Sequence, residues 1–180
     1  LSSLIPASVV INYSKLDYFN GLHIRKLDKE RLAREVKPFL LKAGYVVDDT
    51  KLALMMPIVQ ERLVTLDDII PFGGFYFREN IQPEPGDLVG SKMTSQETVL
   101  IAREIMKILS ELPELEPAEA RLRSLADAMG YSVAQVFGII RVAVTGQKVS
   151  PPLFESMAII GREKVLERIQ NAITILENMN

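Results

Sequence analysis

The sequence of 180 residues contains no cysteine and a single histidine, His23. Without cysteine the chain can form neither a disulfide nor a thiolate metal site, which fits the reducing cytoplasm, where we expect this protein to act. One histidine argues against a zinc site and against a histidine-based catalytic triad, because both need further partners. These absences leave little room for metal or nucleophilic chemistry.

Long apolar runs and a strong excess of either charge are also missing. No apolar run approaches the ~20 residues that cross a membrane, and the first residues lack the basic start and apolar core of a signal peptide, so we expect no membrane partner. The net charge of −2 provides no global basic field, so any contact with nucleic acid must be local. The chain opens at Leu1 without an initiator Met, and we expect it to be part of a longer protein.

Apolar residues recur at helical spacing along most of the chain, and capping residues mark where helices start. Asp28 and Ser132 are predicted N-caps, and Thr94 with Glu97 three residues later predicts a capping box. The predicted helices lie at about 28–44, 50–63, 65–70, 94–112, 117–130 and 132–146, and from about residue 162 onward.

Two stretches near the start of the chain carry weaker signals. Residues 9–13 are short and β-branched, which favours an extended segment. Residues 15–25 predict a short helix that stops near Gly21.

Residues 71–93 interrupt the helical pattern with three prolines and four glycines. We therefore predict an all-α fold, a multi-helical bundle in two lobes. Its first helical subdomain spans 27–93 and includes this Pro/Gly-rich connection. The second spans 94–180, and residues 1–26 precede both.

The most informative stretch is 141–161, which predicts the end of one helix, a polar connection and the start of another. Arg141 shares a helix face with Ala134, Gly138 and Thr145, and the small side chains leave space beside it for a planar group. Ser150 is a predicted N-cap, and Pro151 suits the first position of the next helix.

Leu153 and Phe154 follow within the opening turn of that helix. A guanidinium, a hydroxyl, free backbone N–H groups and an aromatic ring at one corner suit the splayed bases of a single-stranded RNA loop. Each feature also has a structural interpretation, because Arg141 complements its own helix C-terminus and apolar residues at a helix start often belong to the core.

Taken as a sequence, these residues resemble a known family. Arg-Val-Ala-Val-Thr-Gly at 141–146, followed by Val-Ser-Pro-Pro-Leu-Phe-Glu-Ser-Met-Ala-Ile-Ile-Gly-Arg-Glu-Lys-Val-Leu-Glu-Arg-Ile at 149–169, closely resembles the C-terminal anticodon-binding region of bacterial-type glutamyl-tRNA synthetases, which are class I aminoacyl-tRNA synthetases. Residues 15–25, 61–66 and 75–77 are similar to further segments of that family, in the family's order. The resemblance implies the helical cage of class I anticodon-binding domains, with 1–26 as the end of the stem-contact and junction segment.

The resemblance also implies which residues contact the anticodon. Arg62 falls where some members read the third anticodon base and separate tRNA-Glu from tRNA-Gln. Arg123 falls near another anticodon-contacting arginine. The positions that match the family's anticodon pocket are Arg141, Ser150, Pro151, Leu153 and Phe154.

The implied parent is a glutamate–tRNA ligase that uses ATP and Mg²⁺, with tRNA-Glu and an N-terminal catalytic domain as partners. The family's His-Ile-Gly-His-like and Lys-Met-Ser-Lys-like catalytic motifs do not occur in this chain. We therefore expect a monomeric module that binds the anticodon loop, without a catalytic residue, cofactor or metal of its own.

Three alternatives stay open at this point. The chain could be a helical protein-interaction or scaffold module, which its acidic balance favours. It could also be the equivalent domain of another class I synthetase, such as a lysyl enzyme. In a third, closely related interpretation, the parent also charges tRNA-Gln, which Arg62 argues against. The departures from the family pattern are Ile11, Asn12, Tyr18, His23 and Pro152.

Overall fold

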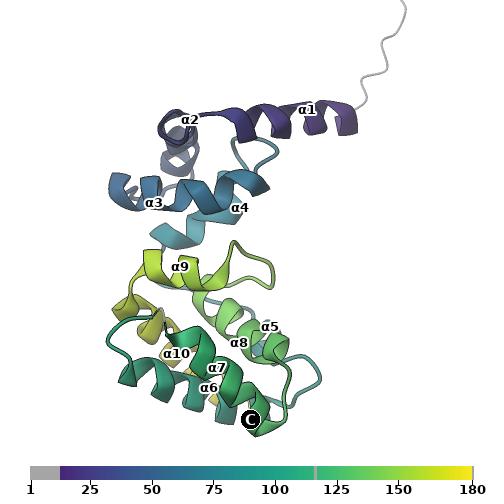
Figure 1. Cartoon of the computed structure of the whole chain (residues 1–180), viewed down its shortest axis with the longest axis vertical. Coiled ribbons are helices and arrows are strands. Elements are labelled where there is room, and N and C mark those ends of the chain that lie inside the picture. Colours follow the sequence, from purple (N-terminus) through teal and green to yellow (C-terminus); the bar gives the residue numbers. More distant parts are fainter. Residues whose placement is uncertain (1–12, 116, 180) are drawn as a thin grey trace, which may run out of the picture.

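The computed structural model describes residues 13–115 and 117–179, and all regular structure within these ranges is helical. Figure 1 shows two lobes stacked along the long axis, with α9 between them. The elements are α1 (Tyr13–Lys26), α2 (Lys29–Lys42), α3 (Asp49–Val59), η1 (Gln60–Arg62), α4 (Ile69–Gly73), η2 (Gly74–Phe77), α5 (Pro85–Leu88), α6 (Ser95–Glu111), α7 (Ala118–Met129), α8 (Val133–Thr145), α9 (Leu153–Ile160) and α10 (Arg162–Glu177), where η marks a 3₁₀ helix. The predicted all-α fold is confirmed, while residues 9–12 of the predicted extended segment lie outside the described residues.

The first lobe, residues 13–77, begins with α1, which continues past the predicted stop at Gly21. A glycine inside a helix costs only about 1 kcal/mol, so it ends a helix only when nothing else holds the chain. Here Ile24 is buried, and the amide of Gln60 donates hydrogen bonds to the carbonyls of Ile24 and Leu27 at 2.9 and 2.8 Å. The prediction of a stop at Gly21 is wrong, because a side chain 36 residues away fixes the true end.

The helices α2 and α3 begin at local caps. The Asp28 carboxylate accepts the N–H of Arg31 at 3.1 Å, as predicted, and Asp48 does the same for Lys51. The predicted helix at 65–70 starts later, at Ile69. The carboxylate of Asp68 accepts the N–H groups of residues 64 and 65, which holds them in a turn before the helix.

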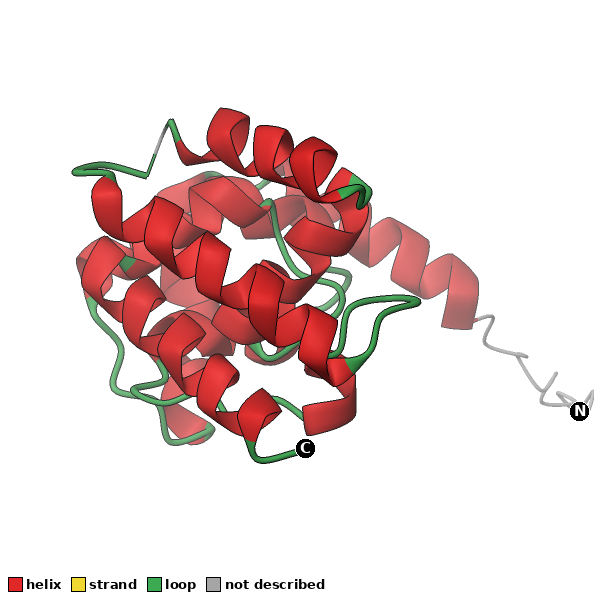
Figure 2. Ribbon diagram, turned by 90° about the horizontal axis from the view of Figure 1, so that it is seen from below, coloured by secondary structure: helices red, strands yellow, loops and turns green. Residues whose placement is uncertain are grey.

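The second lobe, residues 85–179, is a bundle in which α6, α7, α8 and α10 pack together (Figure 2). Both of its main capping signals are real: Thr94 forms a capping box with Glu97, and Ser132 forms one with Gln135. The long helices therefore start where local chemistry sets them.

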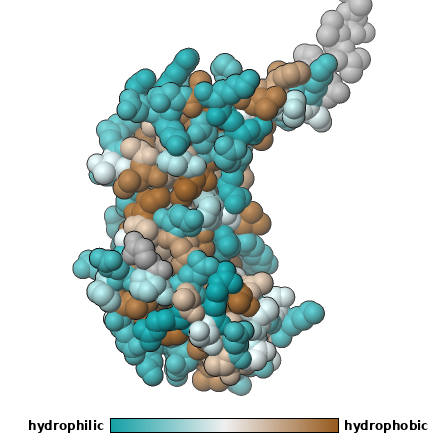
Figure 3. Space-filling view, viewed as in Figure 1, coloured by the Kyte–Doolittle hydropathy of each residue, from teal (hydrophilic) through white to brown (hydrophobic). Residues whose placement is uncertain are grey.

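The two lobes share one hydrophobic core. A single cluster of buried apolar side chains runs from Ile24 to Leu176, and α9 packs on α3 of the first lobe as well as on α8 and α10 of the second. In Figure 3, apolar side chains gather at mid-height between α3–α4 and α9, while polar ones cover most of the rest of this face. The lobes are therefore held together by apolar packing, with α9 at the joint.

Candidate nucleic-acid interface

Arg141 lies just before the last turn of α8 and holds the loop that follows the helix. Its Nη1 donates to the Ser150 hydroxyl at 2.6 Å and to the carbonyl oxygen of Pro151 at 3.2 Å. The side chain is half-buried, and burial, followed by the positive charge of Arg62, lowers the pKa of Arg141. That pKa starts so high that the group stays charged at neutral pH. Because the loop occupies only Nη1, the rest of the guanidinium can face a ligand.

Arg62 brings a second positive charge to this place from the other lobe. It ends η1 and is half-buried, and it is near enough to lower the pKa of Arg141. Like charges are not brought together by attraction to each other, so the fold must impose this pairing. Two cations from different lobes whose charges act on each other suit an anionic ligand.

Arg123, Phe137 and Phe154 form a second group, on α7, α8 and α9. The Arg123 guanidinium lies 5.2 Å from the centre of the Phe137 ring, and that ring meets the Phe154 ring edge-on at 5.1 Å. Arg123 also forms an ion pair with Glu119 at 2.6 Å. The two aromatic rings are half-buried, so they combine a packed side with an accessible one.

Phe137 is a candidate that the sequence analysis missed. The apolar pattern assigns it to the core, yet it lies between two residues expected to contact the anticodon. The signal was available, because Phe137 and Arg141 are four residues apart on one helix and so lie on one side of it.

Ser150, Pro151 and Leu153 are buried, so within this chain they support the site more than they offer a surface. The predicted helix start is also wrong: α9 begins at Leu153, and its N-cap is Pro152. The Ser150 hydroxyl does not cap the helix, because it accepts the Arg141 guanidinium and donates to the carbonyl of Pro151. A charged donor outcompetes a backbone amide for that oxygen.

The space predicted beside Arg141 is not found there: Ala134 and Gly138 leave a hollow that Arg141 does not line. Gly138 and Ala134 line a hollow of about 380 Å³ between α5 and α8, and a side chain added at Gly138 would meet nothing within 4 Å. Neither Arg141 nor Thr145 lines it. A smaller hollow of about 270 Å³ lies beside Phe154.

Two other classes of site receive no support from the described ranges. Across 13–115 and 117–179, no group of three or more histidine, cysteine, aspartate or glutamate side chains could hold a metal ion. None of the helices described is both long enough and apolar enough to span a bilayer.

Comparison with known proteins decides the family. Residues 31–173 match the model of the family described as anticodon binding domain. The chain belongs to this family. The anticodon-binding domain is similar to the glutamate–tRNA ligase of Chloroflexus aurantiacus, with 35% identity over 99% of this chain and 38% of that protein. It is also 36% identical to the glutamate–tRNA ligase of a Roseiflexus species, over 96% of this chain and 36% of the relative.

Solved structures agree with this assignment. The anticodon-binding domain superimposes on a crystal structure of a glutamate tRNA ligase from Elizabethkingia meningosepticum with a TM-score of 0.74 and 25% identity, over 89% of this chain and 32% of that one. The resemblance stated from the sequence is thereby confirmed. The domain spans a little over a third of the length of the curated relatives it matches.

Proposed function

We propose that this domain recognises the anticodon loop of tRNA-Glu for a glutamate–tRNA ligase whose catalytic part lies outside this chain. The observation that carries the proposal is the position of Arg141, which the loop after α8 holds at the joint beside Arg62 of the other lobe. Arginine can bond a base edge through two parallel N–H groups, and unpaired bases in a loop expose such edges.

The two groups of side chains have different roles in this proposal. Arg141 and Arg62 bond base edges or phosphates, with Arg62 separating tRNA-Glu from tRNA-Gln. Phe154 and Phe137 provide aromatic surface for a base, a contact worth roughly 1–3 kcal/mol, with Arg123 beside them. Ser150, Pro151 and Leu153 hold Arg141 and the start of α9 in place.

The parent protein in this proposal is a cytoplasmic monomer that uses ATP and Mg²⁺ in its catalytic domain. Its contact with that domain falls on α1, the first described helix, where Leu16, Tyr18 and Phe19 are all more than half exposed. Exposed apolar side chains gathered on one helix are typical of a surface that another part of the protein covers. This chain alone binds tRNA without aminoacylating it.

The test is binding of the chain to a tRNA-Glu transcript and to the same transcript with one anticodon base changed. Arg141→Ala is expected to weaken binding to the cognate transcript about tenfold and to reduce discrimination between the two, because it removes a base contact. The control, Arg103→Ala, removes the same charge from α6, where Arg103 pairs with Glu177 on the surface. It should leave discrimination unchanged.

Salt dependence separates this function from general attraction of RNA. Specific binding should keep its anticodon dependence as salt rises, while the sequence-independent part weakens steeply. Binding that ignores both the anticodon and Arg141→Ala would contradict the proposal and favour the protein-interaction module instead.

A further inference from the structure

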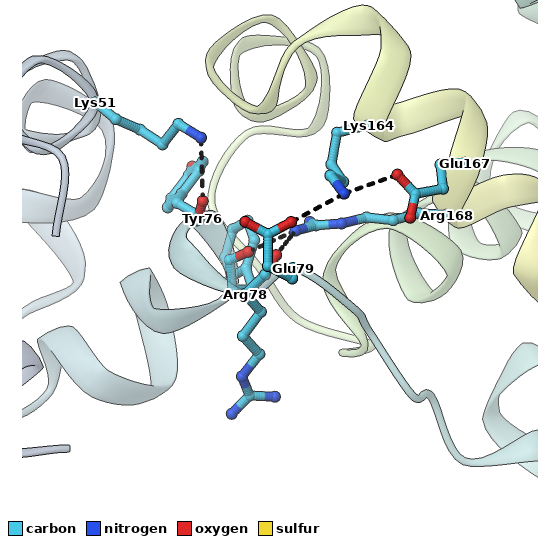
Figure 4. Close-up of polar contacts among 8 residues, drawn as sticks. Lys51, Tyr76, Arg78, Glu79, Lys164, Glu167 and Arg168 are labelled. Carbon is cyan, nitrogen blue, oxygen red and sulfur yellow. Dashed lines mark hydrogen bonds and ion pairs between the residues drawn. The ribbon is translucent and has the colours of Figure 1, made fainter. Parts of the chain in front are cut away.

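Arg168 is a buried cation at the joint between the lobes. Its side chain on α10 is 4% exposed, and among the described residues its guanidinium donates only to backbone carbonyls. The acceptors are Val144 at 2.8 Å, Phe75 at 3.0 Å and Arg78 at 2.6 Å. Figure 4 shows the Arg168 side chain reaching from α10 to the segment after η2. One guanidinium thus joins α10, the end of α8 and the connection from the first lobe.

This arrangement is unfavourable for stability alone. Burial lowers the pKa of Arg168 to about 10, and its Nε has no hydrogen-bond partner among the described residues. Apolar residues of similar volume often replace buried charges at no loss of stability. A buried arginine with an unsatisfied donor therefore indicates a requirement for fixed geometry, since its planar fork sets the directions of several acceptors at once.

A neighbouring ion pair, between Lys164 and Glu79, crosses the same joint. Lys164, one turn before Arg168 on α10, contacts Glu79 at 3.2 Å and Glu167 at 2.7 Å (Figure 4). Glu79 follows the carbonyl of Arg78 in the chain. Side chains of α10 thus hold the connection after the first lobe at two successive residues.

The acceptors of Arg168 lead directly to the proposed anticodon site. Val144 lies in the last turn of α8, three residues after Arg141. Phe75 precedes Tyr76, whose hydroxyl is hydrogen-bonded to Ser156 at 2.7 Å, and Ser156 lies two residues after Phe154. Arg168 therefore ties the backbone that carries Arg141 to the segment that holds the start of α9.

We infer that Arg168 is a positioning residue for anticodon recognition. It fixes the end of α8 and the start of α9 relative to the first lobe, so that Arg141, Phe154 and Arg62 face one ligand. It does not touch the RNA, because its guanidinium is enclosed by three carbonyls and buried. The inference rests on the proposed function for its RNA readout, whereas its structural readout does not depend on RNA.

The test compares Arg168→Met with Leu176→Ala, which truncates another buried side chain two turns further along α10, away from the joint. Both variants are studied at a temperature where circular dichroism shows them fully folded. Hydrogen exchange of residues 142–156 should become about tenfold faster or more in Arg168→Met, because the carbonyl of Val144 is no longer tied through Arg168 to Phe75 and Arg78. In Leu176→Ala the exchange of residues 142–156 should quicken no more than that of α6, because this variant lowers only the global stability.

The RNA readout is the ratio of affinities for the cognate and the altered transcript. Arg168→Met should lower this ratio about fivefold or more, with affinity for the altered transcript unchanged, since only the base contacts are misplaced. Arg168→Lys, which keeps the charge and part of the bonding, should restore some of the ratio. Leu176→Ala should keep it.

The inference would be overturned if hydrogen exchange of residues 142–156 were unchanged in Arg168→Met. It would also be overturned if Arg168→Met and Leu176→Ala changed this exchange and the affinity ratio equally, even when the wild-type chain discriminates between anticodons. A wild-type chain without discrimination would instead overturn the proposed function, and the exchange result would still decide whether Arg168 positions the site.

Discussion

At the residue scale, two groups of arginines in this protein differ in the acceptors of their guanidinium groups. Arg103, Arg121 and Arg123 pair with carboxylates at the surface, where such pairs contribute only about 0–1 kcal/mol. Arg141 and Arg168 donate to backbone carbonyls at the joint. In these two, the guanidinium replaces regular backbone pairing and holds irregular segments in one conformation.

The bond between Arg141 and Ser150 should be measurable as stability. Ser150→Ala removes the 2.6 Å acceptor from a half-buried cation, so we expect a loss of about 1–2 kcal/mol in the free energy of unfolding. Urea denaturation measures it. The matched control is Ser124→Ala, whose exposed hydroxyl donates only to the carbonyl of Ala120, and which should change stability by less than about 0.5 kcal/mol. Equal losses in both variants would show that Arg141 does not depend on this oxygen.

Residue types and spacing located Arg141 at a helix end but could not give its partners. The sequence favours Ser150 as a cap, whereas the folded chain gives its hydroxyl to Arg141. Arg168 is the harder case. Its spacing from Val165 and Ala172 places it on the inward face, but a buried arginine needs acceptors, and its three carbonyls come from distant parts of the chain.

At the element scale, helix ends set by neighbouring residues were predictable, and ends set by distant contacts were not. The capping boxes at Thr94 and Ser132 each need only the residue three positions later. The end of α1 depends on hydrogen bonds from the side chain of Gln60. The start of α9 follows a loop that Arg141 holds through the hydroxyl of Ser150. A single sequence therefore predicts helix ends that neighbouring residues cap, but not those that contacts with distant residues determine.

The turn that ends α8 gives a prediction at this scale. Gly146 and Gly130 have nearly the same φ, 74° and 75°, and both end helices in the left-handed region. A side chain at Gly130 would meet nothing within 4 Å, whereas one at Gly146 would lie 3.0 Å from the buried Ile81. Backbone strain should lower the free energy of unfolding by about 1–2 kcal/mol in both Gly130→Ala and Gly146→Ala.

Gly146→Ala should lower the free energy of unfolding by about 1 kcal/mol more than Gly130→Ala, because the buried Ile81 has to move. Parallel urea denaturation of the two variants gives the difference directly. A loss in Gly146→Ala no larger than in Gly130→Ala would mean that the contact of the turn with Ile81 is loose.

At the scale of the whole molecule, the proposed site needs both lobes, since Arg62 comes from one and Arg141 from the other. The proposed division at residues 93 and 94 separates them in sequence, but the core does not divide there. The helix α9 packs on α3 and η2 as well as on α8 and α10, and Arg168 bonds carbonyls from both lobes. The site therefore depends on two subdomains that hold each other in place.

The shared core predicts that the two lobes unfold together. Leu40 in α2 and Leu109 in α6 are each fully buried, one in each lobe. Leu40→Ala and Leu109→Ala should each lower the free energy of unfolding by about 2–5 kcal/mol. In differential scanning calorimetry each variant should shift one common transition, with calorimetric and van't Hoff enthalpies equal.

If instead Leu40→Ala moved only part of the heat absorption and left a second step at the wild-type temperature, the lobes would be separate cooperative units. Arg62 and Arg141 would then not be held together in the free protein, and RNA binding itself would have to assemble the site.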